Sequence, residues 1–494
     1  MLDFTIKIKL KDKNDDINFA LPMFKLATCK NSDIDKFETN FYFNYHERQL
    51  LAEEKSKIDE KNALKDWDKS KKISNAYELI HISNNKMKSE SISKYIPLSR
   101  SFFKLWEIIN YFNLINTKES IVTGHLAEGP GGFLEACLYY RNRLLKITPL
   151  MDKYFGITLK PYSKEIPGWN KANELIYQFK NNIEIGYGSD NTGDLYKVHN
   201  IRSFTRKIKN NSDGADLITA DGGFDFSINF NKQEVMSHRL ILSELLTGIK
   251  SQKIGGAFVC KLFDSYSHLT IQLLYFISCL YQEVYLIKPL TSRPANSEKY
   301  MVALSYIGFN SIKKEQYYIC LLENILYNWN DIINNDYIFQ SIFEEPPIEF
   351  YNRIDEYNKQ SFNQQKIYLE KTLDIITNKP DWKELEIIFN EQTEKAVNWC
   401  RAYNLPITID SYFYQKYQLK KNKQSNYENK TYNNTVNTTD NTTVNTEVNT
   451  EVNTTTVSKK EEIKLLEKED EQKEVKYKKY IEELDNYFEK FIGY

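Results

Sequence analysis

The sequence predicts an α/β protein with a mainly parallel sheet in the middle of the chain. Three observations predict this class: apolar runs alternate with helical patterns between residues 95 and 310, most of the 17 glycines fall in that part, and polar loops follow several of the apolar runs. Strands separated by helices form βαβ units, whose neighbouring strands are parallel. Ligands bind to such sheets beyond the carboxyl ends of the strands, so we expect a functional site in the loops there.

The expected elements follow one another along the chain. In the middle part, strands are expected at 121–127, 154–158, 215–220, 256–262, 284–288 and 300–306, and helices at 133–140, 235–249 and 269–279. Before it, strands are expected near 4–10, 22–28 and 39–45, followed by a charged helix from about 46 to 68. After it, amphipathic helices are expected at 365–376 and 382–403, separated by the breaker Asn378-Lys379-Pro380.

Composition divides the chain of 494 residues into five parts. They are an N-terminal α+β accessory region (1–94), the α/β domain (95–310), a mostly helical extension (311–420), an Asn/Thr-rich linker (421–457) and a charged C-terminal helix (458–494). The linker has too few apolar residues to offset the entropic cost of ordering, so we expect it to be disordered. The C-terminal helix has a thin apolar stripe, so it is either a solvated helix or one that docks on a protein partner. We identify no candidate functional residue in residues 1–90.

Charge is spread unevenly along the chain. The whole chain has 66 Lys and Arg and 67 Asp and Glu, a net charge of −1, which alone would argue against a nucleic-acid partner. Residues 1–310, however, have 42 basic and 35 acidic residues, a net of +7, and residues 311–494 have 24 and 32, a net of −8. The basic excess is modest, so an RNA partner has to be argued from motifs.

Cysteine spacing and hydropathy argue against several classes of protein. The six cysteines are scattered and never paired as CxxC, so we expect neither a disulfide framework nor a metal site, which fits a reducing compartment. No run of about 18 apolar residues occurs, so we expect no membrane-spanning helix. The first residues alternate like a strand and do not resemble a secretory signal.

A glycine-rich turn follows the strand expected at 121–127. The segment His125-Leu-Ala-Glu-Gly-Pro-Gly-Gly-Phe133 contains three glycines and leads into a helix. Its backbone can approach a ligand closely, and the N–H groups at the start of the helix favour a negative group. The turn matches neither GxGxxG nor a P-loop. Taken alone, it is either a ligand-binding loop or an ordinary connection between a strand and a helix.

Two charged residues lie at the ends of expected strands. Asp221 directly follows the apolar run DLITA and precedes two glycines. Its carboxylate either points into the crevice beyond the sheet or belongs to a simple Asp-Gly turn. Lys261 lies at the end of an apolar strand, where it needs a counter-charge or an altered pKa, unless its amine extends to solvent.

Two more segments bring charged residues to the same edge of the sheet. The polar loop from Leu290 to Tyr300 places Asn296 and Glu298 just before a strand, and Lys104 lies at the start of the helix before the first strand. Each residue could be ordinary by itself. Together with Asp221 and Lys261, they would place two lysines and two carboxylates around one crevice beside the glycine turn.

The four residues Lys104, Asp221, Lys261 and Glu298 resemble the Lys-Asp-Lys-Glu tetrad of the FtsJ/RrmJ-like RNA ribose 2′-O-methyltransferases. Three segments are similar to those of the mRNA cap 2′-O-methyltransferases: ADGGFDF, GGAFVCKLFD and IKPLTSRPANSEKYMV. The resemblance covers about 95–310. It implies a Rossmann-like sheet that binds S-adenosylmethionine (SAM), and a methyl transfer to the ribose 2′-hydroxyl of a 5′-terminal nucleotide in capped mRNA, without a metal.

The resemblance also implies which residues contact the cofactor and the substrate. SAM would be bound by Ser99, Ala127, Glu128, Gly129, Pro130, Gly131, Gly132, Phe133, Asp194 and Leu195. The capped RNA would be contacted by Asn231, Lys232, Gln233 and Asn296. Outside these matches, the basic run Arg202, Arg206, Lys207 and Lys209 is either a phosphate-contact strip or a solvated helix face.

Lys261 has two candidate roles in this reaction. It is either the general base that takes the proton of the 2′-hydroxyl or the residue that steers the 2′-oxygen. A general base needs a pKa near about 7–8, which the neighbouring ammonium of Lys104 would favour. Asp221 and Glu298 oppose such a shift, so we expect them to orient the two lysines.

The resemblance leaves the methylated nucleotide open. His125, Glu128 and the segment 190–194 are similar to the enzymes that act on the second transcribed nucleotide, whereas Gly131-Gly132-Phe133 and 293–297 resemble those that act on the first. Two alternatives differ in function: an rRNA or tRNA ribose methyltransferase, and an inactive RNA-binding scaffold, against which the intact tetrad argues.

The composition also bears on where the protein acts. Its richness in Asn, Lys, Ile and Tyr is compatible with an AT-rich genome such as that of a large DNA virus. We therefore expect the protein in the cytoplasm of a host cell or in a virion, with the nucleus as the alternative.

Overall fold

The computed structural model describes residues 2–30, 45–60, 64–83, 87–115, 117, 119–146, 151–163, 166–223, 232–333 and 337–421. Several sequence-based expectations lie outside these residues. They are the strand at 39–45 except its last residue, the RNA contact Asn231, the linker beyond residue 421, and the C-terminal helix.

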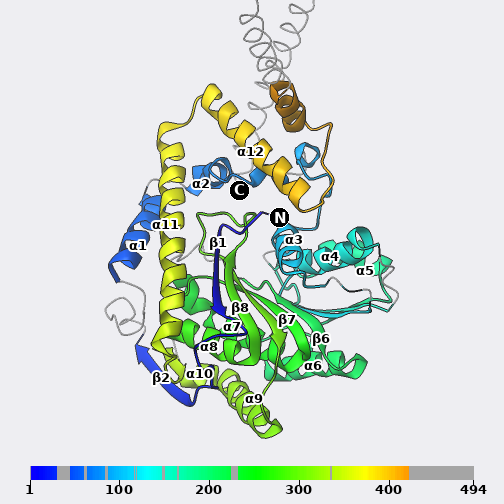
Figure 1. The fold of residues 1–494 in the computed structure, drawn as a ribbon, viewed down its shortest axis with the longest axis vertical. Coiled ribbons are helices and arrows are strands. Elements are labelled where there is room, and N and C mark those ends of the chain that lie inside the picture. Colours follow the sequence, from blue (N-terminus) through cyan, green and yellow to red (C-terminus); the bar gives the residue numbers. More distant parts are fainter. Residues whose placement is uncertain are drawn as a thin grey trace, which may run out of the picture.

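An eight-stranded sheet with the order β1-β8-β9-β7-β6-β3-β4-β5 lies at the centre of the molecule (Figure 1). Its strands are β1 (Ile6–Lys11), β3 (Val122–Leu126), β4 (Lys153–Ile157), β5 (Ile183–Gly186), β6 (Ala215–Ala220), β7 (Gln252–Leu262), β8 (Tyr281–Lys288) and β9 (Lys299–Tyr306). Strands β3 to β7 pair in parallel, whereas β9 is antiparallel to both its neighbours and β1 is antiparallel to β8. The predicted α/β class is confirmed, and the N-terminal region contributes a strand to the same sheet.

Helices cover both faces of this sheet. They are α3 (Ser101–Phe112), α4 (Gly132–Tyr139), α5 (Asn173–Gln178), α6 (Val198–Asn211), α7 (Gln233–Ser251) and α8 (His268–Leu280). Successive strand residues point to opposite faces, so Leu217 of β6 packs in a core with Phe102 and Phe133, and Ile218 packs in another core with Ile201 and Leu245. Because both faces are buried, the central strands read as continuous apolar runs in the sequence.

Further elements surround the central layers. They are β2 (Phe24–Lys30), α1 (Tyr45–Glu60), α2 (Leu64–Ile73), α9 (Ile312–Tyr327), α10 (Trp329–Ile332), β10 (Tyr337–Phe343), α11 (Ile348–Asn378), α12 (Trp382–Ala402) and a helix over 412–421, with 3₁₀ turns at Glu78–Ile80, Lys88–Glu90 and Asn170–Ala172 and a π turn at Tyr140–Leu144. Strands β2 and β10 form a separate two-stranded antiparallel sheet. In Figure 1, α11 runs along one side of the molecule and α12 lies across its upper part.

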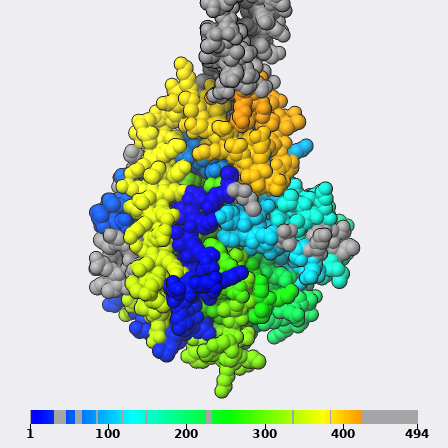
Figure 2. Space-filling model, in the orientation of Figure 1, coloured from blue at the N-terminus to red at the C-terminus, as the bar shows by residue number. Residues whose placement is uncertain are grey.

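Helix α11 begins earlier than the sequence pattern predicts. The prediction starts at 365, but the helix starts at Ile348, because Tyr351, Ile354 and Tyr357 are buried at helical spacing among polar neighbours. The N-terminal segment lies against this helix (Figure 2). There the guanidinium of Arg353 donates a hydrogen bond of 2.7 Å to the carbonyl of Leu10 and pairs with Asp15. The accessory region and the helical extension therefore pack on each other and on the sheet.

The topology gathers the candidate residues at one edge of the sheet. The carboxyl ends of β3, β6 and β7 lie side by side in the parallel register, and the antiparallel β9 begins at the same edge. Within the described part of the chain, no helix is long and apolar enough to cross a membrane. The same residues contain no group of three or more His, Cys, Asp or Glu side chains placed to hold a metal ion.

Candidate active site

The four tetrad residues form two ion pairs at this edge of the sheet. Lys104 of α3 has its Nζ 2.7 Å from each carboxylate oxygen of Glu298, which directly precedes β9. Lys261 of β7 has its Nζ 2.8 Å from the backbone oxygen of Asp221 and 3.3 Å from its Oδ1. All four side chains are only 11–15% exposed. Residues from four separate parts of the chain thus meet as the sequence predicts.

The charges of the tetrad influence one another. Burial lowers the pKa of Lys261, but the carboxylates of Asp221 and Glu298 outweigh burial and raise that pKa above its usual value. Burial raises the pKa of Glu298, but Lys104 and Lys261 hold it at about 2. At neutral pH the amine of Lys261 is therefore an ammonium group. This direction is opposite to the one that a general base needs.

Two buried residues that the sequence analysis missed hold Asp221 in place. Tyr300 of β9 donates a hydrogen bond of 2.9 Å from its hydroxyl to Asp221 Oδ1. Glu244 of α7 accepts a hydrogen bond of 3.2 Å from the backbone N–H of Gly222. Burial raises the pKa of Glu244 to about 8, so this carboxyl group is largely protonated at neutral pH. A lone carboxylate in the apolar helical run LILSELLTGI was the sequence signal for it.

Glu244 predicts a pH dependence of stability. Its usual pKa of 4.5 rises to about 8 in the folded protein, so the folded state binds the extra proton and stability falls as pH increases through this window. Replacing Glu244 by Gln removes this loss. Thermal unfolding at pH 5 and pH 8.5 measures this effect. We expect the difference in melting temperature, Glu244→Gln minus the unmodified protein, to be larger at pH 8.5 than at pH 5 by at least about 2 °C.

The matched control for Glu244 is Glu323, a carboxylate with the opposite shift. Its hydrogen bonds from Arg202 and Lys250 overcome burial and lower its pKa. Its ionised form therefore stabilises the fold above pH 4.5, and Glu323→Gln should lower the melting temperature more at pH 7 than at pH 4. A pH-independent difference for Glu244→Gln would contradict the assignment.

The predicted glycine turn forms a closely packed junction between β3 and α4. A Cβ atom at Gly132 would lie 2.3 Å from the hydroxyl oxygens of both Ser99 and Ser101, so any other residue there would displace these side chains. These two hydroxyls are also hydrogen bonded to each other at 2.6 Å. The structure thereby brings Ser99 against the glycine turn. The neighbouring Ala127 adopts φ +53°, which turns the chain away from the sheet.

A chain of buried polar side chains ends at Glu128. His125 contacts the hydroxyls of Thr123 and Thr219 at 2.8 Å each, and Thr219 in turn donates a hydrogen bond to Glu128 Oε1. Glu128 is 3% exposed, and its Oε2 lies 3.3 Å from His125 Nδ1 without a hydrogen-bond partner among the described residues. Burial raises the pKa of this carboxyl group. A buried acceptor of this kind suits a ligand that offers an N–H donor, such as an amino group.

The second predicted cofactor loop, with Asp194 and Leu195, is fixed by its own hydrogen bonds. Asp194 Oδ1 accepts from the backbone N–H of Tyr196 at 2.9 Å, and its backbone oxygen accepts from the side chain of Asn200 at 3.0 Å. Gly193 adopts φ +72° and lies so close to Thr158 that a Cβ atom would be 1.8 Å from the carbonyl oxygen. The position of Asp194 therefore depends on a glycine directly before it.

The predicted RNA contacts lie partly at this site. Asn296 accepts a hydrogen bond of 2.9 Å at Oδ1 from the amine of Lys288. Gln233, at the start of α7, accepts one of 2.7 Å from the hydroxyl of Ser297. Lys232 is half-buried just before Gln233, and Asn231 lies outside the described residues. Asn296 thus belongs to the loop that ends in Glu298, and Gln233 contacts that loop from α7.

The basic run on α6 does not form an obvious phosphate strip. Arg202 pairs with Glu323 at 2.5 Å, and Lys207 pairs with Glu184 at 2.6 Å. Arg206 is exposed on the same helix, as a solvated face would be. Of the two interpretations, the solvated helix face is the better supported.

The amino-acid sequence was compared with those of known proteins, and it is similar to methyltransferases. Residues 97–306 match the family of FtsJ-like methyltransferases. The cap-specific mRNA (nucleoside-2′-O-)-methyltransferase 1 of Dictyostelium discoideum is 31% identical over 280 residues, which are 52% of this chain and 34% of that protein. The enzyme of the same name from Homo sapiens is 31% identical over 223 residues, 44% of this chain and 25% of that protein.

A relative of the second type is also similar. The cap-specific mRNA (nucleoside-2′-O-)-methyltransferase 2 of Drosophila melanogaster is 28% identical over 226 residues, 45% of this chain and 31% of that protein. The chain thus spans only a quarter to a third of the length of these curated relatives. The part that matches the FtsJ-like methyltransferases, residues 97–306, contains Lys104, Asp221, Lys261, Glu298 and the glycine turn.

Proposed function

We propose that this protein methylates the ribose 2′-hydroxyl of a 5′-terminal nucleotide in capped mRNA, with SAM as the methyl donor. The observation on which the proposal depends is the paired tetrad, in which Lys104–Glu298 and Lys261–Asp221 meet beside the glycine turn. The names of the similar cap-specific enzymes support the choice of substrate.

The residues of the glycine turn fit SAM. The unpartnered Oε2 of Glu128 can accept a hydrogen bond from the amino group of the methionine part, and Gly132 allows the close approach of Ser99. The loop with Asp194 and Leu195 follows β5, which is separated from β3 by β4, and the adenosine part would bind there. When bound, SAM supplies a methyl group that is already activated by its positive sulfonium.

Lys261 would steer the ribose oxygen during the transfer. Its ammonium carries three N–H donors, of which those toward Asp221 are directed at the backbone oxygen and at Oδ1. A remaining donor can bind the 2′-oxygen and direct its lone pair at the methyl group. Holding the reactants in this near-attack geometry lowers the barrier by several kcal/mol. As the bond between the 2′-oxygen and the methyl carbon forms, the carbon–sulfur bond of SAM would break and leave a neutral thioether. The proton on the alkylated oxygen would then be strongly acidic and pass to solvent.

The proposal is tested with matched RNAs. Short RNAs of one sequence, capped and uncapped, are incubated with the protein and tritiated SAM, and label is counted in the RNA. We expect label in the capped RNA only. Equal labelling of both would overturn the cap proposal and support an rRNA or tRNA ribose methyltransferase, while no labelling of either would support an inactive RNA-binding scaffold.

The same capped RNA identifies the nucleotide. Digestion and mass analysis of the product show whether the first or the second transcribed nucleotide has gained a methyl group. Similarity to relatives of both types makes this measurement necessary.

A further inference from the structure

The loop between β8 and β9, residues 289–298, presents Asn296 and Glu298 to the site. Glu298 acts on Lys104 through an ion pair of 2.7 Å, so the placement of the loop decides the placement of the lysine. The loop has no regular secondary structure, and its position depends on side chains that hold its backbone. Three buried charged residues contact it, at its start, its middle and its end.

Glu107 holds the start of the loop. This residue lies on α3, one turn after Lys104, and is fully buried. Its carboxylate accepts hydrogen bonds from the backbone N–H groups of Leu290 at 2.8 Å and Thr291 at 2.9 Å. It accepts a third, of 3.0 Å, from the indole of Trp399 in α12. The helix that bears Lys104 is thereby fastened to the loop that bears its partner.

Lys288 holds the end of the loop. Its amine, on a residue only 2% exposed, donates to the backbone oxygens of Asn296 at 2.8 Å and Glu298 at 2.7 Å, and to Asn296 Oδ1 at 2.9 Å. When the amine is protonated, these contacts use all three of its donors. They fix both the backbone of the loop and the amide of Asn296.

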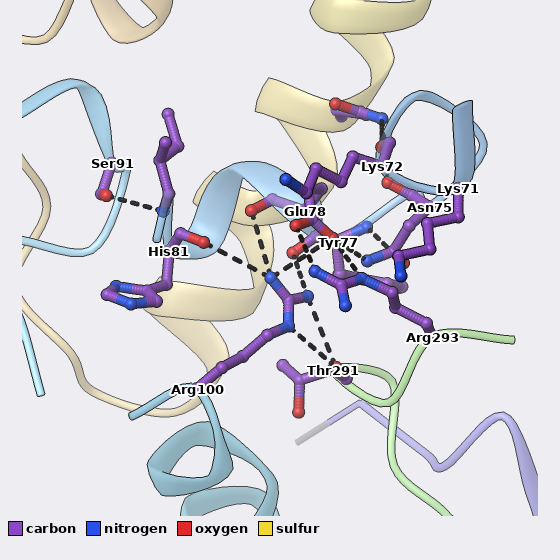
Figure 3. A network of polar contacts seen from close by, with 12 residues as sticks. Lys71, Lys72, Asn75, Tyr77, Glu78, His81, Ser91, Arg100, Thr291 and Arg293 are labelled. Carbon is purple, nitrogen blue, oxygen red and sulfur yellow. Dashed lines mark hydrogen bonds and ion pairs between the residues drawn. The ribbon is translucent and has the colours of Figure 1, made fainter. Parts of the chain in front are cut away.

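Glu78 holds the middle of the loop, and it comes from outside the methyltransferase domain. Its carboxylate pairs in two places with Arg293, at 2.8 Å and 3.1 Å. Arg100 lies 3.4 Å from the same carboxylate and donates to the carbonyl of Thr291 at 3.4 Å. Figure 3 shows both arginines converging on Glu78. Glu78 is 7% exposed, and the two guanidinium groups hold its pKa at about 2 in spite of burial.

We propose that Glu78 is a positioning residue of the active site. Through Arg293 and Arg100 it fixes the loop so that Glu298 meets Lys104 and Asn296 faces the substrate. The N-terminal accessory region, in which the sequence shows no functional residue, is on this proposal part of the catalytic unit. The inference rests on the proposed methyl transfer, because its effect is expressed in that reaction.

The variant Glu78→Gln tests the proposal against Glu90→Gln. Glu90 lies in the same accessory region and accepts a hydrogen bond of 2.7 Å from the backbone N–H of Tyr412, away from the loop. We expect Glu78→Gln to lower kcat on capped RNA about 10- to 100-fold, because a small misplacement of reacting groups has effects of this size. Glu90→Gln should stay within about twofold of the unmodified protein, since distant sites act independently.

SAM binding and a second variant separate positioning from a general loss of structure. For Glu78→Gln, the dissociation constant of SAM should stay within about threefold, because the glycine turn and Glu128 are not touched. A variant that merely unfolds would lose SAM binding and kcat together. Arg293→Lys serves as a second variant, because it keeps the charge but loses the two-point pairing, and it should lower kcat about 3- to 10-fold.

The outcomes are distinguishable from those of the proposed function. If the unmodified protein and Glu90→Gln label capped RNA and Glu78→Gln labels it equally fast, the positioning role is overturned. A parallel loss of SAM affinity in both Glu78→Gln and Arg293→Lys would overturn it as well. If the unmodified protein itself does not label capped RNA, the proposed function fails.

Discussion

Replacing Lys261 by methionine is expected to lower methyl transfer to capped RNA by about 10³-fold, the size of effect typical for a residue that acts directly on the reacting proton or oxygen. Methionine has nearly the length of lysine but no donor, so the 2′-oxygen loses its hydrogen bond. Asp221 keeps its hydrogen bond from Tyr300, and the loop with Gly222 keeps its contact with Glu244. Single-turnover labelling with tritiated SAM measures the rate of the chemical step.

A measurement of SAM affinity and a control variant at a second lysine complete this experiment. SAM affinity, measured by calorimetry, should stay within about threefold, because the glycine turn is separate from Lys261. Lys250→Met is the matched control: its amine also pairs with a buried carboxylate, Glu323 at 2.9 Å, but at the far end of α7. That variant should keep its activity. If Lys261→Met retained a tenth or more of the activity, the role of this lysine would be refuted.

Replacing Gly193 by alanine is expected to weaken SAM binding about tenfold or more. An alanine at φ +72° costs about 1 kcal/mol, and its Cβ would overlap the carbonyl oxygen of Thr158 at 1.8 Å. Because that oxygen belongs to the backbone, the overlap is relieved only by a shift of the loop, at a further cost of about 1–3 kcal/mol. The shift moves Asp194 and Leu195, which directly follow Gly193.

Gly255 provides the control for the backbone strain alone. It has a similar φ of +83°, but a Cβ atom there would meet nothing within 4 Å. Gly255→Ala should therefore lower stability slightly and leave SAM affinity unchanged in a calorimetric titration. Equal losses of affinity in the two variants would show that strain, and not displacement of the cofactor loop, is responsible.

The sequence was informative where function depends on the ends of strands. Asp221 and Lys261 each terminate an apolar run, and parallel neighbours necessarily bring such ends together, so their meeting was predictable. The sequence left two roles open for Lys261, because the sign of its pKa shift depends on distances to carboxylates that spacing cannot give.

The sequence did not predict contacts between residues that are far apart in the chain. Glu78 and Arg293 are 215 positions apart and belong to different regions, and neither lies in a periodic pattern that would connect them. In the sequence, Tyr300 looks like an ordinary strand residue, and only the structure shows that its hydroxyl donates a hydrogen bond to Asp221. In the same way, the alternation of β1 predicted a strand, but it did not predict that this strand pairs with β8. Pairing between segments so far apart in the sequence has no local sequence pattern.

The pairing of β1 with β8 has a consequence for synthesis of the protein. The segment IKIKLK leaves the ribosome long before the strand that pairs with it, which begins at Tyr281. At about 5–20 residues per second, β1 is exposed without its partner for on the order of 10–50 s. A bare strand of this kind is prone to pair with other nascent chains. Its alternating lysines, Lys7, Lys9 and Lys11, repel one another between two such copies and so protect the chain until the edge of the sheet is completed.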